Sequence, residues 1–148
     1  MEAIQVGVGA EVIVPALRRH HEGRTPDRAT GLNILLVDDE PDFNLLVAEA
    51  LGDAGHRVTT ASNGEEALNL ITRELFDVMV CDIRLPKLDG LALARRIRCD
   101  PELAGVRLLA LTGYCEASDR ARSAAAGFDR HLVKPVDSDT LRTLLLGD

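Results

Sequence analysis

The chain has few aromatic residues and no tryptophan, and this scarcity limits what it could bind. Phe, Tyr and Trp make up 3% of its 148 residues, while apolar residues make up 46%. We therefore expect an aliphatic core and no surface that stacks nucleic-acid bases. The net charge of −7 also disfavours direct binding to nucleic acid or to anionic membranes.

Long apolar runs and paired cysteines are missing as well. No apolar stretch approaches about 18 residues, and the N-terminus lacks a basic segment followed by an apolar one, so neither a membrane span nor a signal peptide is expected. The three cysteines, Cys81, Cys99 and Cys115, show no CxxC spacing, which argues against a zinc or disulfide framework. These absences predict a cytoplasmic protein.

The main part of the chain alternates between strand-like and helix-like patterns. Short apolar runs predict strands at about 33–38, 57–61, 78–82, 107–112 and 130–133. Apolar residues at helical spacing predict helices at about 42–53, 64–74, 90–99, 118–126 and 138–146. Five such alternations predict an α/β fold in which helices cover both faces of a doubly wound parallel sheet.

The first predicted helix carries the longest apolar stripe. Its members follow the i, i+3, i+4, i+7 and i+8 spacing, and they are Phe43, Leu46, Val47, Ala50 and Leu51. We expect this stripe to face the sheet.

Charged and hydroxyl side chains follow four of the predicted strands. Asp38 and Asp39 follow the first strand, Asp82 ends the third, Thr112 ends the fourth and Lys134 follows the fifth. The carboxyl ends of parallel strands meet at one edge of an open α/β sheet, where ligands bind. Carboxylates gathered there repel one another unless a cation lies among them, so the pattern predicts a hard-metal site with a phosphate-like ligand. Either member of the acid pair could also cap the helix that follows.

These motifs resemble the receiver domains of two-component response regulators. The resemblance covers residues 33–146 and rests on four segments in family order, namely 35–40 (LLVDDE), 82–90 (DIRLPKLDG), 111–113 (LTG) and 132–135 (LVKP). It implies a five-stranded parallel sheet in the flavodoxin-like order 2-1-3-4-5, with a (βα)5 topology.

The resemblance also implies roles for the residues at the strand ends. Asp82 would accept a phosphoryl group from a phosphohistidine of a histidine kinase or a histidine phosphotransfer protein. Asp38, Asp39, Asp82 and the backbone carbonyl of Arg84 would bind Mg²⁺, for which Mn²⁺ could substitute. Thr112 and Lys134 would each contact the phosphoryl group.

A conformational switch follows from the same resemblance. Thr112 and His131 would change position on phosphorylation, although many family members have Tyr or Phe where this chain has His131. Pro135 is a candidate for a cis peptide bond, with a trans turn as the alternative. The output surface would comprise the helix starting near Ser118, the strand at 130–133 and the last helix, and the same surface could form a homodimer.

Residues 1–31 look different from the rest, and we interpret them as an N-terminal extension or linker that precedes a receiver domain at 32–148. Apolar residues alternate with polar or small ones between Ile4 and Val14, and the segment from Arg18 to Asp27 is polar. Residues 8–15 faintly resemble the closing strand of a kinase ATP-binding domain, which would make this segment a remnant of a hybrid histidine kinase.

Two other functions remain open at this stage. An aspartate-nucleophile phosphatase of the haloacid dehalogenase type has Asp-x-Asp after its first strand, whereas here Asp38 and Asp39 are adjacent. A receiver-like binding module that takes no phosphate would not need Asp82, Thr112 and Lys134. The leading interpretation is a signalling module that catalyses only its own phosphorylation and dephosphorylation. The sequence does not identify the kinase, the stimulus, the output partner or the oligomeric state.

Overall fold

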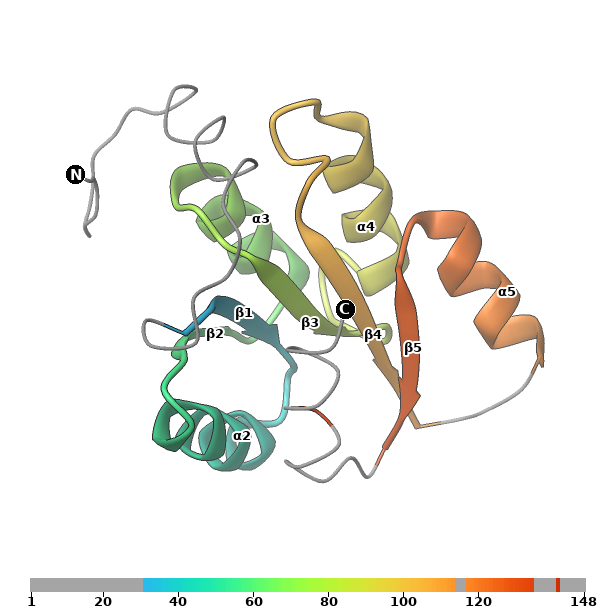
Figure 1. The fold of residues 1–148 in the computed structure, drawn as a ribbon. Coiled ribbons are helices and arrows are strands. Elements are labelled where there is room, and N and C mark those ends of the chain that lie inside the picture. Colours follow the sequence, from blue (N-terminus) through green and yellow to red (C-terminus); the bar gives the residue numbers. More distant parts are fainter. Residues whose placement is uncertain (1–30, 114–116, 135–140, 142–148) are drawn as a thin grey trace.

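Five parallel strands form the centre of the molecule. The computed structural model describes residues 31–113, 117–134 and 141. The strands are β1 (Asn33–Val37), β2 (Arg57–Ala61), β3 (Val78–Asp82), β4 (Arg107–Thr112) and β5 (Arg130–Val133). Their order in the sheet is β2-β1-β3-β4-β5, and every neighbouring pair is parallel, which confirms the predicted fold and strand order (Figure 1).

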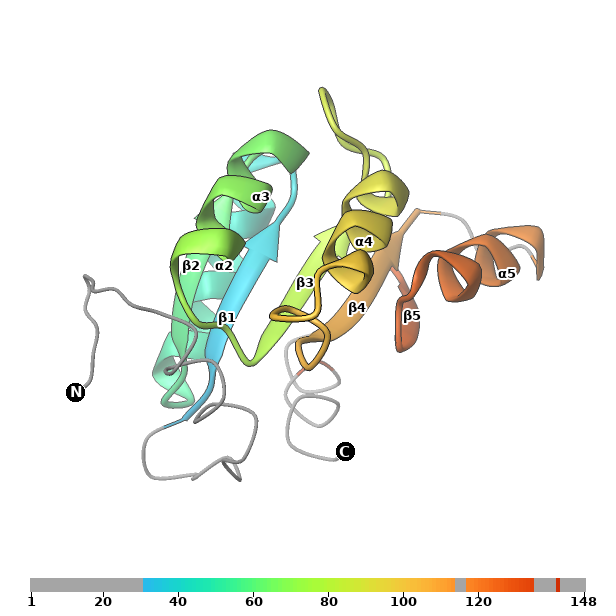
Figure 2. The same cartoon turned by 90° about the horizontal axis from the view of Figure 1, so that it is seen from above.

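Helices connect successive strands and cover both faces of the sheet (Figures 1 and 2). They are α2 (Pro41–Asp53), α3 (Gly64–Arg73), α4 (Gly90–Cys99) and α5 (Ala117–Ala126). The predicted helix at 138–146 lies outside the described residues except for Leu141, as does the predicted extension up to residue 30. Within the described part of the chain, no helix is long and apolar enough to cross a membrane.

The strands alternate their side chains between two aliphatic cores. On one face, Leu36, Val80 and Leu111 pack with Val47 and Leu51 of α2 in the smaller core. The larger core on the opposite face is formed by the intervening strand residues together with α3, α4 and α5. Its strand members include Leu35, Val37, Met79, Leu108 and Ala110. All of these strand positions are completely buried, as expected for a parallel sheet that is covered on both faces.

One side chain of the predicted apolar stripe lies elsewhere. Leu46 is 65% exposed, as is Leu45, so the prediction that Leu46 faces the sheet was wrong. The residues that α2 buries are Asn44, Val47 and Leu51. Asn44 donates a side-chain hydrogen bond to the Asp38 carbonyl at 2.8 Å, so this polar residue takes part in the buried face of the helix and Leu46 does not.

A glycine allows α4 to start very close to the end of β3. The Gly90 N–H donates to the Ile83 carbonyl at 2.8 Å. A Cβ at this position would lie 2.5 Å from the carbonyl oxygen of Asp82 and 2.8 Å from the Cα of Ile83. Because both neighbours are backbone atoms, a larger residue would displace the chain around Asp82.

We expect opposite effects from alanine at two helical glycines. Gly90→Ala should lower the free energy of unfolding by about 2 kcal/mol, because it overpacks the backbone. Gly52→Ala in α2 is the matched control, since a Cβ there meets nothing within 4 Å, and it should stabilise the fold by about 0.5–1 kcal/mol. Urea denaturation of both variants measures the difference, and equal stabilities would contradict this account of Gly90.

Candidate functional site

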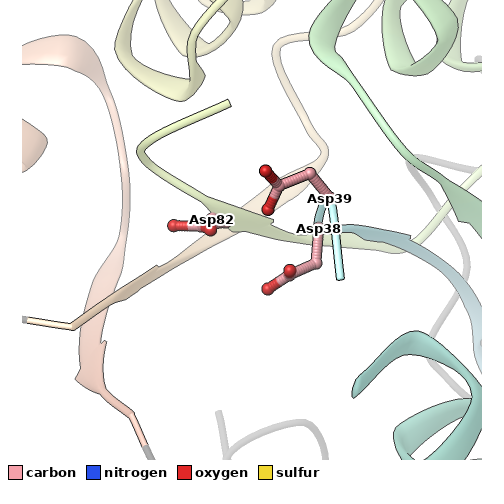
Figure 3. A group of neighbouring side chains, drawn as sticks. All are labelled: Asp38, Asp39 and Asp82. Atoms are coloured by element: carbon pink, nitrogen blue, oxygen red, sulfur yellow. The ribbon is translucent and has the colours of Figure 1, made fainter. Parts of the chain in front are cut away.

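Three aspartates meet at the carboxyl ends of the neighbouring strands β1 and β3. Asp38 and Asp39 follow β1, and Asp82 ends β3 (Figure 3). One carboxylate oxygen from each lies within 4.8 Å of the others. Asp38 is completely buried, Asp82 is 9% exposed and Asp39 is exposed. The structure thus brings together the three acids that the sequence predicted as metal ligands.

The backbone around Asp38 fixes its side chain. The Asp38 N–H donates to the Ala61 carbonyl at 3.1 Å, which extends the pairing of β1 with β2. Its Oδ1 accepts the Glu40 N–H at 2.9 Å. Glu40 itself occupies the N-cap position of α2, so neither Asp38 nor Asp39 is the capping residue.

The Lys134 ammonium lies among the acids. Its Nζ is 2.6 Å from Asp38 Oδ2, 3.4 Å from Glu40 Oε1 and 3.5 Å from Asp82 Oδ2. The ring of Phe43 is 4.7 Å away, measured to its centroid. The backbone N–H of Lys134 donates to the Thr112 carbonyl at 2.7 Å. Lys134 therefore contacts both Asp38 and Asp82, with Asp38 the closer partner.

The electrostatic environment of Asp82 disfavours its charged form. Burial raises its pKa above the ordinary value, and the charges of Asp38 and Asp39 add to this effect. Lys134 and the hydrogen bond from the Arg84 N–H to Asp82 Oδ1, at 3.2 Å, oppose the rise only in part. A cation close to Asp82 would therefore stabilise its charged form.

Burial acts on the neighbouring ionisable groups as well. It would lower the pKa of Lys134, but the hydrogen bond with Asp38 and the charges of Asp82 and Asp38 raise that pKa overall. The pKa of Cys81 lies well above its ordinary value because the thiol is buried and close to Asp82. Lys134 is thus a permanent cation at neutral pH, and Cys81 is an inert thiol.

The two predicted switch residues lie on adjacent strands. Thr112 is buried at the end of β4, where it pairs with Val133 of β5. His131 pairs with Ala110 in the same ladder, and its Nδ1 lies 2.9 Å from the hydroxyl of Ser123 on α5. Pro135 is outside the described residues, so its cis peptide bond stays a prediction. The role of the Arg84 carbonyl as a metal ligand also stays a prediction.

Sequence reasoning missed two neighbours of Lys134. Glu40 and Phe43 both contact its ammonium, yet neither was identified as a site residue. The sequence held a weak signal for Glu40. Glu is not a favoured N-cap residue, so the Glu40 side chain was available for contacts other than capping.

The donor set fits a hard divalent cation. Carboxylate oxygens are the ligands that Mg²⁺ prefers, and it takes few of them from the protein. Asp38, Asp39 and Asp82 supply such oxygens within one small region. Burial of Asp82, with a smaller effect from the charges of Asp38 and Asp39, raises its pKa, and a cation bound among these oxygens would favour the charged form.

Residues 34–146 match the family model of the response regulator receiver domain. Among curated proteins, the chain is 42% identical over 106 residues to an uncharacterized 14.6 kDa protein of Leptolyngbya boryana. The matched region covers 72% of this chain and 81% of that protein. Several other curated relatives are much longer, and the chain spans from 13% to 42% of their length.

Solved structures of similar proteins have the same architecture. The chemotaxis response regulator CheY4 of Vibrio cholerae is 32% identical, with a TM-score of 0.74 over 78% of this chain and 97% of that one. The receiver domain of the sensor histidine kinase PA1611 from Pseudomonas aeruginosa is also 32% identical, with a TM-score of 0.73 over 80% of this chain and 99% of that one. That structure has a magnesium ion coordinated in its active-site cleft.

Removing the charge of Asp82 should stabilise the protein when no divalent cation is present. We expect Asp82→Asn to raise the free energy of unfolding at pH 7 by about 1 kcal/mol, because a buried carboxylate near two others is costly. Because the pKa of Asp82 is raised in the folded state, ionisation of Asp82 destabilises the wild type. The stability gained by Asp82→Asn should therefore shrink as the pH falls through that raised pKa toward the ordinary value of 3.8, below which Asp82 is protonated in the folded and the unfolded state alike. Urea titrations across this pH range, with EDTA present, measure the gain, and a variant less stable than the wild type would contradict the account.

Proposed function

The chain belongs to the response regulator receiver domain family of two-component signalling, and we propose that Asp82 accepts a phosphoryl group from a phosphohistidine. The donor would be a histidine kinase or a histidine phosphotransfer protein. The observation that carries this proposal is the buried position of Asp82 beside Lys134 and within the three-aspartate cluster. Receiver domains are signalling modules and not conventional enzymes.

The transfer would exchange one bond for another. The phosphorus–nitrogen bond of the phosphohistidine breaks, its electron pair stays on the imidazole, and a carboxylate oxygen of Asp82 bonds to phosphorus. Lys134 would move its contact from Asp82 to a phosphoryl oxygen, and the Thr112 hydroxyl would donate to another. These two donors would offset charge on the transferring group.

A divalent cation would complete the site. Asp38, Asp39, Asp82 and the backbone carbonyl of Arg84 would hold Mg²⁺, or Mn²⁺ in its place. The ion, when bound, neutralises negative charge on the carboxylates and on the phosphoryl oxygens. Without such neutralisation, an incoming phosphoryl dianion would meet a cluster that already carries three carboxylates.

Phosphorylation would then change the surface formed by α5, β5 and the last helix. Thr112 and His131 lie on the paired strands β4 and β5, and His131 already contacts α5 through Ser123. The phosphorylated and unphosphorylated forms would differ in population between two conformers and not in fold.

Incubation with acetyl phosphate and Mg²⁺ tests the central proposal. We expect intact mass spectrometry to show one acid-labile phosphate on the wild type, and none on Asp82→Asn or in the presence of EDTA. An adduct that persists in Asp82→Asn would overturn the assignment of the acceptor. The absence of any adduct would favour a phosphate-independent binding module, and turnover of many phosphate esters would favour a phosphatase.

A phosphohistidine domain that reaches Asp82 would dock against the exposed leucines of α2. Leu46 is one helical turn after Phe43, whose ring contacts Lys134 in the site. Leu45 and Leu46 are the exposed large hydrophobic residues of the described chain, and they sit on the helix that starts at the site. A histidine that delivers phosphate to Asp82 must bring its own domain against this region, which would bury both leucines.

We expect Leu46→Ser to slow transfer from a phosphohistidine protein at least about tenfold, since losing one buried Leu contact costs roughly 1.5–3 kcal/mol and each 1.4 kcal/mol corresponds to a factor of about ten. Labelling by acetyl phosphate should not change, because this small donor needs no docking surface. Transfer rates would be measured with a kinase selected from a purified panel for transfer to the wild type. Asn69→Ser, an exposed change on α3, is the control, and equal slowing with both donors would refute the docking role.

A further inference from the structure

We propose that Glu40 is a positioning residue for Lys134. Its carboxylate keeps the Lys134 ammonium in the site when a divalent cation binds to the aspartates. This inference rests on the proposed function and assigns a task to a residue outside the aspartate cluster. It starts from the contacts of Glu40.

The side chain of Glu40 is not used by the helix that it precedes. Glu40 is the N-cap residue of α2, yet its side chain makes no capping hydrogen bond. Its backbone is fixed from both sides, because its N–H donates to Asp38 Oδ1 at 2.9 Å and its carbonyl accepts the Asn44 N–H at 3.1 Å. The carboxylate instead accepts a hydrogen bond from Lys134 Nζ at 3.4 Å.

The carboxylates around Lys134 fall into two groups. Asp38 and Asp82 belong to the cluster whose oxygens lie within 4.8 Å of one another, and Glu40 does not. A divalent cation bound by the cluster would draw charge from Asp38 and Asp82 and would also repel the ammonium. Glu40 would keep its whole charge for Lys134.

The ring of Phe43 supports the same position. It lies 4.7 Å from Lys134 Nζ, a distance at which an aromatic face attracts an ammonium. A bound cation would not compete directly for this contact, since an aromatic ring is not a ligand for hard metals. Glu40 and Phe43 therefore form a holding contact for Lys134 that does not depend on Asp38.

The contact with Glu40 is also one that a phosphoryl oxygen could displace. The Glu40 side chain is 66% exposed, and ion pairs of such residues are weak and screened by water. A weak contact biases the position of Lys134 without trapping it, so the ammonium can move to a phosphoryl oxygen when one arrives.

The two lysines of the chain make this inference measurable by NMR. Lys87 and Lys134 are the only lysines in the sequence, so labelling with ¹³C,¹⁵N-lysine gives one set of side-chain signals for each. Lys87 is exposed and serves as the internal reference for a mobile side chain. The order parameter of the ε-methylene group would be recorded without Mg²⁺ and with saturating Mg²⁺ in wild type, Glu40→Gln and the control Glu49→Gln.

We expect Lys134 to be ordered in all three proteins without Mg²⁺, because Asp38 holds it. With saturating Mg²⁺, it should stay ordered in the wild type and in Glu49→Gln, but its order parameter should fall toward that of Lys87 in Glu40→Gln, where only the ring of Phe43 still holds it. A loss of order in the wild type, or an equal response in wild type and Glu40→Gln, overturns this inference alone. A wild type that binds no Mg²⁺ by calorimetry overturns both the inference and the proposed metal site.

Discussion

The contact between one ammonium and two of three crowded carboxylates is the interaction on which the site depends. Lys134 contacts Asp38 at 2.6 Å and Asp82 at 3.5 Å, while Asp39 completes the cluster. Three carboxylates and one ammonium leave two negative charges in a partly buried region, where charges interact more strongly than in water. The fold therefore tolerates the cluster but does not neutralise it, and this excess negative charge is the physical basis for the proposed binding of a divalent cation.

The sheet creates this crowding through its strand order. β1 lies between β2 and β3, and α2 and α4, the helices that follow β1 and β3, lie on opposite faces of the sheet (Figure 1). In an open α/β sheet, ligands bind at the ends of neighbouring strands whose helices diverge in this way, which here are β1 and β3. One residue of each helix contacts the backbone at the site. Asn44 of α2 donates a hydrogen bond to the Asp38 carbonyl, and Gly90 of α4 packs on the Asp82 carbonyl.

The sequence predicted those features that depend on local pattern or strand ends. All five strands lie within one residue of their predicted limits, because apolar runs end at polar or turn residues, and the strand-end acids and Lys134 gather as expected. The burial of Asn44 in place of Leu46 could not be predicted, because Asn44 is polar and its bond to the Asp38 carbonyl forms only in the folded chain. The contact of Glu40 with Lys134 joins residues 94 positions apart, and which acid lies nearest an ammonium is decided only by three-dimensional packing.

The ends of β4 and β5 connect the site to α5 through contiguous contacts. The Lys134 N–H donates to the Thr112 carbonyl. His131 lies three residues earlier, on β5, and its imidazole contacts Ser123 on α5. The Ser123 hydroxyl also donates to the Arg120 carbonyl at 3.1 Å. A continuous route does not by itself make a switch, which requires two arrangements of the same groups. A hydroxyl that donates to a carbonyl can accept from the imidazole only while Nδ1 carries a proton, so the tautomer of His131 determines whether β5 and α5 are joined by this bond.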